Sequence, residues 1–304
     1  MKTLLFLATV ALGLGIGSSA PQEPAPVLSI KTDLVTLPVT VADRHGGFIS
    51  GLASKHFTVY DEGEPTPVAF FTNDDVPITI GLVVDSSTSM RVRRAQITAA
   101  ATAFATMSHP LDEFFTVNFN ESVWLGLPQP LAFTRDVAQL RAALAAAPAY
   151  GRTALFDAVD RAIDHLLLGT RDRKALIVVS DGGDNASTHT LEAVLQHARM
   201  TDAVIYAVIL FERDDREARP RVLKTLARET GGRTFTPQQT ADIAPAFGQI
   251  ARELRSGYTI GVVPPEGAVG FRIVRVVAND GTHRQLVART RVGYYAGPPR
   301  QTKQ

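Results

Sequence analysis

The fold of this chain is decided by residues 78–89, which read ITIGLVVDSSTS. Residues 78–84 form an almost continuous apolar run, which is typical of a strand that helices cover on both faces of a parallel sheet. Asp85, Ser87 and Ser89 follow directly and offer one carboxylate and two hydroxyls. Open α/β sheets hold their ligands in loops at the carboxyl ends of strands. Hard oxygen donors at such a position suit a small hard cation such as Mg²⁺.

Strand-like and helix-like segments alternate on both sides of this stretch, over residues 76–256. The expected strands are 78–84, 114–119, 123–127, 175–179, 203–210 and 234–235, and the expected helices are 95–107, 134–147, 154–168, 191–200, 223–229 and 243–254. Thr134 is the expected N-cap of its helix. Alternation of this kind predicts an α/β fold with a doubly wound, mostly parallel sheet and helices on both faces.

The two flanks of this region are β-rich. Residues 27–75 contain strand-like segments at 35–41, 57–60 and 68–71, and residues 257–297 contain others at 258–263, 271–278 and 285–292. Pro38 places the first of these strands at a sheet edge or a bulge. Neither flank alone has enough strands to bury a face well. We therefore expect the two flanks to combine into one small β-sandwich, with the α/β domain inserted between them.

The first 20 residues are interpreted as a signal peptide for export. Lys2 supplies the positive n-region, residues 4–17 supply an apolar segment, and residues 18–20 offer small side chains for cleavage. An uncleaved anchor is the alternative, although the apolar segment is too short to span a bilayer comfortably. Residues 21–26 form a proline-rich linker and residues 298–304 a tail. No other stretch is apolar and long enough to cross a membrane. We expect no stable membrane span after signal cleavage, and a secreted or periplasmic location.

Composition narrows the classes of partner. The chain has 31 basic and 30 acidic residues and a formal net charge of +1. Nucleic-acid binding usually requires a clustered basic face, so nucleic acid is not an expected partner. Cysteine is absent, which excludes disulfides and a thiolate metal site.

Two further motifs are expected at the same sheet edge as residues 85–89. Thr153 lies in GRTAL, residues 151–155, where a helix is expected to begin. Asp181 lies in VVSDG, residues 178–182, directly after an expected buried strand. An open sheet can gather two carboxylates and three hydroxyls at this edge. The set is Asp85, Ser87, Ser89, Thr153 and Asp181. Single Asp and Ser residues at strand ends are also common caps and turns, and Asp184 and Asn185 are expected to have that role.

These three motifs, in this order and on these elements, resemble the von Willebrand factor A family, in particular its secreted bacterial VWFA-related branch. The resemblance covers residues 76–256, and the β-rich flanks also look like those of that branch. It implies a metal-ion-dependent adhesion site (MIDAS). In such a site the two serines and the threonine bind Mg²⁺ directly or nearly so, and the two aspartates act largely through water. The open coordination position would accept an Asp or Glu side chain from a partner protein.

One residue departs from the family pattern. The family often has Gly-Gly-Thr where this chain has Gly151-Arg152-Thr153. Arg152 is therefore expected at the rim of the metal site. It either pairs with the second carboxylate oxygen of the partner or points to solvent. The choice between Mg²⁺, Mn²⁺ and Ca²⁺ also stays open, although a small hydroxyl-rich site favours Mg²⁺.

The leading interpretation of function is a non-enzymatic, adhesion-type protein-binding module. A metal-dependent hydrolase is one alternative, since Mg²⁺ lowers the pKa of bound water, but the sequence places no general base. An envelope assembly component that works through its β-sandwich is another. A further hypothesis, by family analogy, is a switch in which helix 243–254 couples the metal site to strand 258–263.

Overall fold

The computed structural model describes residues 34–211, 217–282 and 285–297. The expected signal peptide, the linker and the C-terminal tail lie outside these residues. Within the part that is described, no helix combines the length and apolarity needed to cross a bilayer.

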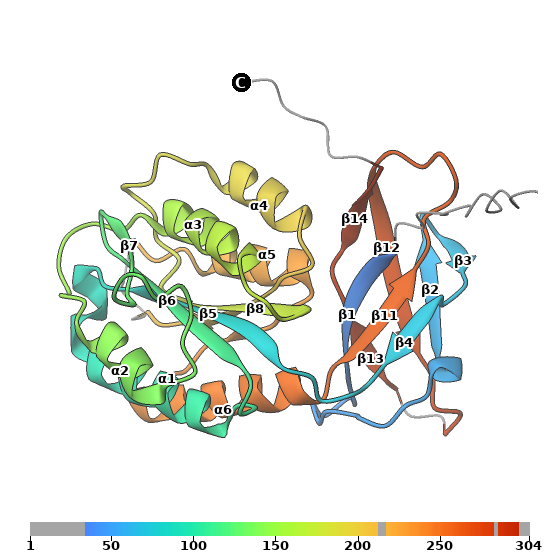
Figure 1. The fold of residues 1–304 in the computed structure, drawn as a ribbon, viewed down its shortest axis with the longest axis horizontal. Coiled ribbons are helices and arrows are strands. Elements are labelled where there is room, and N and C mark those ends of the chain that lie inside the picture. The colour runs from blue at the N-terminus through green and yellow to red at the C-terminus, as the bar shows by residue number, and fades with distance from the viewer. Residues whose placement is uncertain (1–33, 212–216, 283–284, 298–304) are drawn as a thin grey trace, which may run out of the picture. The chain divides into compact units, whose positions relative to one another are not determined.

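The centre of the fold is a six-stranded sheet with the order β10-β9-β8-β5-β6-β7 (Figure 1). Its strands are β5 (Ile78–Asp85), β6 (Glu113–Phe119), β7 (Val123–Leu125), β8 (Arg173–Ser180), β9 (Val204–Ile209) and β10 (Thr234–Phe235). All neighbouring strands pair in parallel except β7, which is antiparallel to β6. The predicted α/β fold with a mostly parallel sheet is confirmed.

Helices cover both faces of this sheet (Figure 1). They are α1 (Arg94–Met107), α2 (Val137–Ala145), α3 (Leu155–Leu167), α4 (Leu191–Arg199), α5 (Pro220–Thr230) and α6 (Ile243–Arg255). Side chains of α1 and α6 share one core with Leu82 and Val84 of β5. Those of α3, α4 and α5 share a second core with Val83. Every residue of β5 is buried, which is why the sequence there is an apolar run without alternation.

Strands from the two flanks form two four-stranded antiparallel sheets, ordered β13-β1-β11-β4 and β14-β12-β2-β3. Their bounds are β1 (Val35–Ala42), β2 (Phe57–Asp61), β3 (Glu64–Thr66), β4 (Phe70–Thr72), β11 (Tyr258–Val262), β12 (Gly270–Ala278), β13 (Val287–Arg289) and β14 (Gly293–Ala296). Each sheet mixes strands from both flanks, and the two sheets share one hydrophobic core. The predicted β-sandwich built from both flanks is confirmed. The exact domain boundaries stay predictions.

Two sequence predictions about these elements are wrong in detail. Helix α2 is capped by Asp136 rather than Thr134, because the Asp136 carboxylate accepts hydrogen bonds from the first-turn amides of Ala138 and Gln139. Thr134 instead forms an isolated bridge with Phe114. The predicted strand 285–292 is too long: β13 spans only Val287–Arg289, because the chain then crosses to the other sandwich sheet, where β14 begins at Gly293.

Candidate metal centre

The first and third motifs meet at one edge of the central sheet because their strands are neighbours. β5 and β8 pair in parallel, with Val84 opposite Val179. Asp85 is the last residue of β5, and Asp181 follows the last residue of β8. Parallel pairing of two buried strands therefore brings both carboxylates to the same side of the molecule.

The Asp85 carboxylate is fully buried and organises the loop that follows it. Its Oδ1 accepts a hydrogen bond from the backbone amide of Ser87 at 2.8 Å, and its Oδ2 accepts one from Ser180 Oγ at 2.7 Å. The first bond turns the chain at Ser87, directly before a short 3₁₀ helix that spans Thr88–Arg93. Both oxygens thus have protein partners, which suits an indirect role in a metal site.

Three of the predicted side chains form a continuous chain of oxygen atoms. Ser87 Oγ and Ser89 Oγ lie 3.2 Å apart, and Ser89 Oγ donates a hydrogen bond to Asp181 Oδ2 at 2.8 Å. An octahedral Mg²⁺ with ligands at about 2.1 Å requires neighbouring ligand oxygens about 3 Å apart. The spacing of these three oxygens fits that requirement.

Thr153 lies at the N-terminus of α3, where the loop after Asp181 holds it in place. Its backbone amide donates to Asn185 Oδ1 at 2.9 Å, and its carbonyl accepts from the amide of Asn185. The Phe156 amide donates to Asp184 Oδ2 at 2.9 Å. Asp184 and Asn185 therefore cap this helix end, as expected, by satisfying amides that have no partner within the helix. The Thr153 hydroxyl makes no hydrogen bond to any residue that the structure describes.

A cavity of about 470 Å³ opens above these groups. Four of the five predicted residues line it, and Asp85 lies beneath them. The remaining lining residues include Arg152, Asp184, Asn185, Glu217 and Arg219. Arg152 lines this cavity, and its expected place at the rim of a metal ion stays a prediction. Its backbone amide donates to Glu121, and its guanidinium contacts no carboxylate within the described ranges.

Burial controls the charge of the innermost carboxyl group. The pKa of Asp85 is raised to about 6, mainly by burial and to a smaller extent by the nearby charge of Asp181. The hydrogen bonds from Ser87 and Ser180 act in the opposite direction because they stabilise the carboxylate.

Two contributors to this site were not singled out from the sequence. Ser180 bonds directly to Asp85, as described above. Arg94 donates from Nη1 to Ser86 Oγ at 2.6 Å and from Nη2 to the carbonyl of Leu144. Burial lowers the pKa of Arg94, and the charge of Asp85 partly offsets this effect. Arg94 thus ties the loop after β5 to the end of α2.

The donor set differs from the usual clusters of acidic and histidine ligands. Among the described residues, no group of three or more His, Cys, Asp or Glu side chains is arranged to hold a metal. Three of the five side chains considered above carry neutral hydroxyls. Hard, oxygen-only donors of this kind suit Mg²⁺ and similar cations rather than softer transition metals.

Comparison with known proteins identifies the family. The sequence model of the von Willebrand factor type A domain matches residues 79–249, more than half of the chain. The protein belongs to the von Willebrand factor type A family. No curated protein sequence matches it.

Two solved structures illustrate the likeness of fold. One is a von Willebrand factor type A protein from Catenulispora acidiphila, with 15% identity over 87% of this chain and 74% of that chain and a TM-score of 0.53. The other is proximal thread matrix protein 1 from the mussel byssus, with 14% identity over 69% of this chain and 51% of that chain and a TM-score of 0.51. At these identities, the likeness shows a shared fold.

Proposed function

We propose that this protein is a non-enzymatic, adhesion-type binding module that engages an Asp or Glu side chain of a partner protein through a divalent metal ion. The ion would be held by Asp85, Ser87, Ser89, Thr153 and Asp181. The observation that carries this proposal is the spacing of the oxygens of Ser87, Ser89 and Asp181, at 3.2 Å and 2.8 Å. That spacing matches the edges of an octahedral coordination shell.

The charge of the site favours an anionic ligand. Three of the five side chains are neutral, and both oxygens of Asp85 already accept hydrogen bonds from Ser87 and Ser180, so a bound Mg²⁺ would keep part of its positive charge. Thr153 lies at the N-terminus of α3, and the helix dipole places partial positive charge there. A carboxylate arriving from the cavity would therefore meet positive potential from both the ion and the helix end.

Arg152 is proposed to contribute to the choice of ligand. It lines the cavity beside Thr153, and no described carboxylate pairs with its guanidinium. A guanidinium at the rim can bind the second oxygen of a carboxylate that is already bound to the metal.

A catalytic function has less support than binding. A general base must be within reach of a reacting proton and free to accept it. Asp85 and Asp181 already accept hydrogen bonds within the site. Asp184 accepts one from the α3 end, and Glu217 accepts one from Asn185. The expected signal peptide supports a secreted or periplasmic setting for the proposed binding.

The proposal is tested first by calorimetry with MgCl₂ and then by capture of envelope proteins on the immobilised chain, with Mg²⁺ or with EDTA. We expect Mg²⁺ uptake, and captured proteins that are released by EDTA and absent with Asp85→Ala. The matched control is Glu266→Ala, which removes an exposed carboxylate in a turn of the β-rich flank. If no divalent ion binds, or if the same proteins are captured in EDTA and by Asp85→Ala, the metal has no part in the function.

A further inference from the structure

A second cavity, of about 400 Å³, lies where the C-terminal end of α5 meets strands β12 and β13 of the sandwich. It is at the opposite edge of the central sheet from Asp85. Gly232, which lines it, packs against Ile205 near the start of β9, whereas the metal centre lies at the carboxyl ends of the strands. The cavity is therefore separate from the candidate metal centre.

All charged residues that line this cavity are basic. They are Lys224, Arg228, Arg233, Arg275, Arg289 and Arg291, and the lining contains no acidic residue. The chain as a whole carries nearly equal numbers of basic and acidic residues. This basic cavity is thus a local concentration of positive charge in an otherwise balanced protein.

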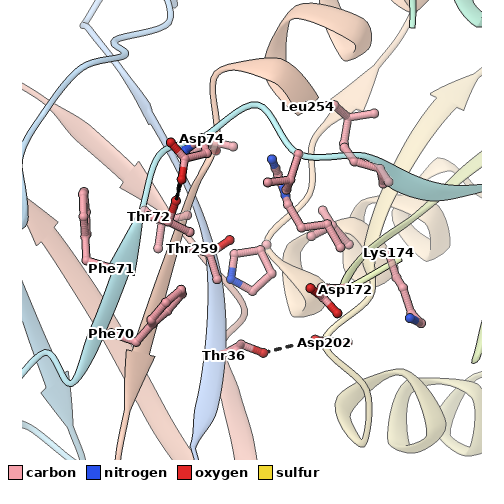
Figure 2. A pocket seen from close by; sticks show the side chains of 18 of the residues that line it. Thr36, Phe70, Phe71, Thr72, Asp74, Asp172, Lys174, Asp202, Leu254 and Thr259 are labelled. Atoms are coloured by element: carbon pink, nitrogen blue, oxygen red, sulfur yellow. Dashed lines mark hydrogen bonds between the residues drawn. The ribbon is translucent and has the colours of Figure 1, made fainter. Parts of the chain in front are cut away.

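A different cavity, of about 730 Å³, is lined by both acidic and basic residues (Figure 2). It is lined by Asp172, Lys174 and Asp202 among other residues, and Thr36 Oγ1 donates to Asp202 Oδ2 at 3.1 Å (Figure 2). Charges of both signs lie close together there. The larger cavity therefore lacks the single sign of charge that distinguishes the basic cavity.

Two carboxylates behind the basic cavity neutralise only part of its charge. Glu229 pairs with Arg199 and Arg228, and the fully buried Glu253 pairs with Arg289 and lies 3.8 Å from Arg233. Within the described ranges, no carboxylate lies within ion-pair distance of the other three basic side chains. These are Lys224, Arg275 and Arg291.

Among the described residues, Arg291 is the clearest case of a buried cation without a carboxylate at ion-pair distance. Its side chain is buried, with 7% of the residue exposed. Its Nε donates to the carbonyl of Gly293 at 2.6 Å and its Nη2 to the carbonyl of Arg199. Burial lowers the pKa of this guanidinium, and the charge of Asp202 partly offsets that effect. A buried cation with only neutral carbonyl partners is costly unless an anion compensates it.

Two buried polar atoms beside Arg291 also lack partners in the part of the chain that is described. They are Arg289 Nε and Thr290 Oγ1, and both residues line the basic cavity. Buried donors are normally satisfied by protein, water or ligand. Within the described residues, the wall of the basic cavity therefore contains unsatisfied donors as well as unpaired cations.

One glycine, Gly231, allows this wall to form. Gly231 ends α5 with φ of 81°, a left-handed conformation that favours glycine. A Cβ added to Gly231 would lie 2.5 Å from the carbonyl carbon of Thr290. The chain carrying Thr290 and Arg291 can therefore approach the end of α5 only because no side chain is present there.

We propose that the basic cavity binds a multiply charged phosphate group, such as the phosphate or pyrophosphate ester of an envelope glycan or lipid. Guanidinium groups bind phosphate oxygens in pairs, and lysine adds a point charge. The volume of the cavity is suited to a small charged head group rather than to a long polymer. This site does not depend on the proposed metal centre.

The test is calorimetry of the full chain with inorganic pyrophosphate in a metal-free, phosphate-free buffer, so that the metal centre plays no part. The double variant Lys224→Gln/Arg275→Gln removes two cations that have no carboxylate partner. The matched control Arg141→Gln/Arg161→Gln removes two exposed cations on α2 and α3. We expect pyrophosphate to bind the native chain and the control equally, and the cavity variant about tenfold or more weakly.

Circular dichroism shows whether both double variants are folded, and the single variant Lys224→Gln repeats the test if the double variant is not. Absence of pyrophosphate binding, or equal weakening in both double variants, overturns the proposal. Citrate that binds as tightly as pyrophosphate also overturns it, because the site would then recognise carboxylates. Glucose 1-phosphate and vesicles containing phosphatidic acid then distinguish a glycan source from a lipid source.

Discussion

Ser89 Oγ lies 2.8 Å from Asp181 Oδ2, although the two residues are 92 positions apart in the chain. The contact exists because β5 and β8 are parallel neighbours whose carboxyl ends carry the two loops. Ser89 also lies 3.2 Å from Ser87 at the hydroxyl oxygens. Ser89 Oγ is therefore the central atom of the three oxygens on which the proposed metal site depends.

Replacement of the Ser89 hydroxyl should weaken metal binding more than replacement of the neighbouring Thr88 hydroxyl. We expect Ser89→Ala to lower the affinity for Mg²⁺ by about tenfold or more, since loss of a ligand or its supporting contact typically has that effect. Thr88→Ala is the matched control, because Thr88 lines the same cavity but its hydroxyl bonds, among the described residues, only to the carbonyl of Gly151. Calorimetry with MgCl₂ measures the Mg²⁺ affinity of each variant, and equal affinities in the two variants would count against the site.

Asp85→Asn separates metal binding from folding. Burial disfavours the charged form of Asp85 and raises its pKa to about 6, so the folded metal-free protein holds this proton more tightly than the unfolded chain. Its stability consequently falls as pH rises from the unfolded value toward 6. A neutral amide of the same shape avoids this loss. We expect metal-free Asp85→Asn at pH 7.5 to melt no lower than the native chain while its Mg²⁺ binding is abolished. A large drop in melting temperature would show that the carboxylate is needed for folding itself.

The sequence was sufficient to predict the central sheet because burial on both faces leaves a simple signal. The apolar run 78–84 and the run 175–179 became β5 and β8, as predicted. Ser180 was missed, although its position carried a signal. Side chains alternate along a strand, so the residue before Asp181 points to the opposite side, and there it meets Asp85. For Arg94 the sequence offers no comparable signal, because it reaches Ser86 through the turn of a 3₁₀ helix.

The sandwich and the basic cavity are harder to predict from the sequence. Strand alternation did not reveal that the predicted strand 285–292 ends at Arg289, or that a further strand begins at Gly293 in the other sheet. A Cβ added to Gly293 would lie 2.2 Å from the carbonyl oxygen of Arg272, so this glycine permits β14 to begin against β12. The basic side chains of the cavity come from positions 224 to 291. Only tertiary structure brings them together.

His189 should titrate above the usual range for histidine. Its hydrogen bond to Asp157, at 2.8 Å, is the main cause of a raised pKa, and the charges of Asp160 and Asp164 add to it. The contact is fully stabilising below the unfolded pKa of 6.5 and is lost as pH rises through the higher folded value. Because 46% of the side chain is exposed, the effect on stability is small. We expect NMR titration to give a lower His189 pKa in Asp157→Asn, and an unchanged value would show that the contact is absent in solution.

A buried ion pair connects α6 to the sandwich. Glu253 on α6 is fully buried and forms an ion pair with Arg289 of β13. Burial raises the pKa of Glu253, and the charge of Arg289 is the largest opposing effect. Removal of one member of a buried pair leaves the other uncompensated and costs on the order of 3 kcal/mol. We expect Glu253→Leu to lower the free energy of unfolding in urea by about that amount, while Glu253→Leu/Arg289→Leu loses less, because neither charge is left behind. If the double variant loses the sum of both single effects, the pair does not couple α6 to β13, and the hypothesis of a switch that passes through α6 loses its structural basis.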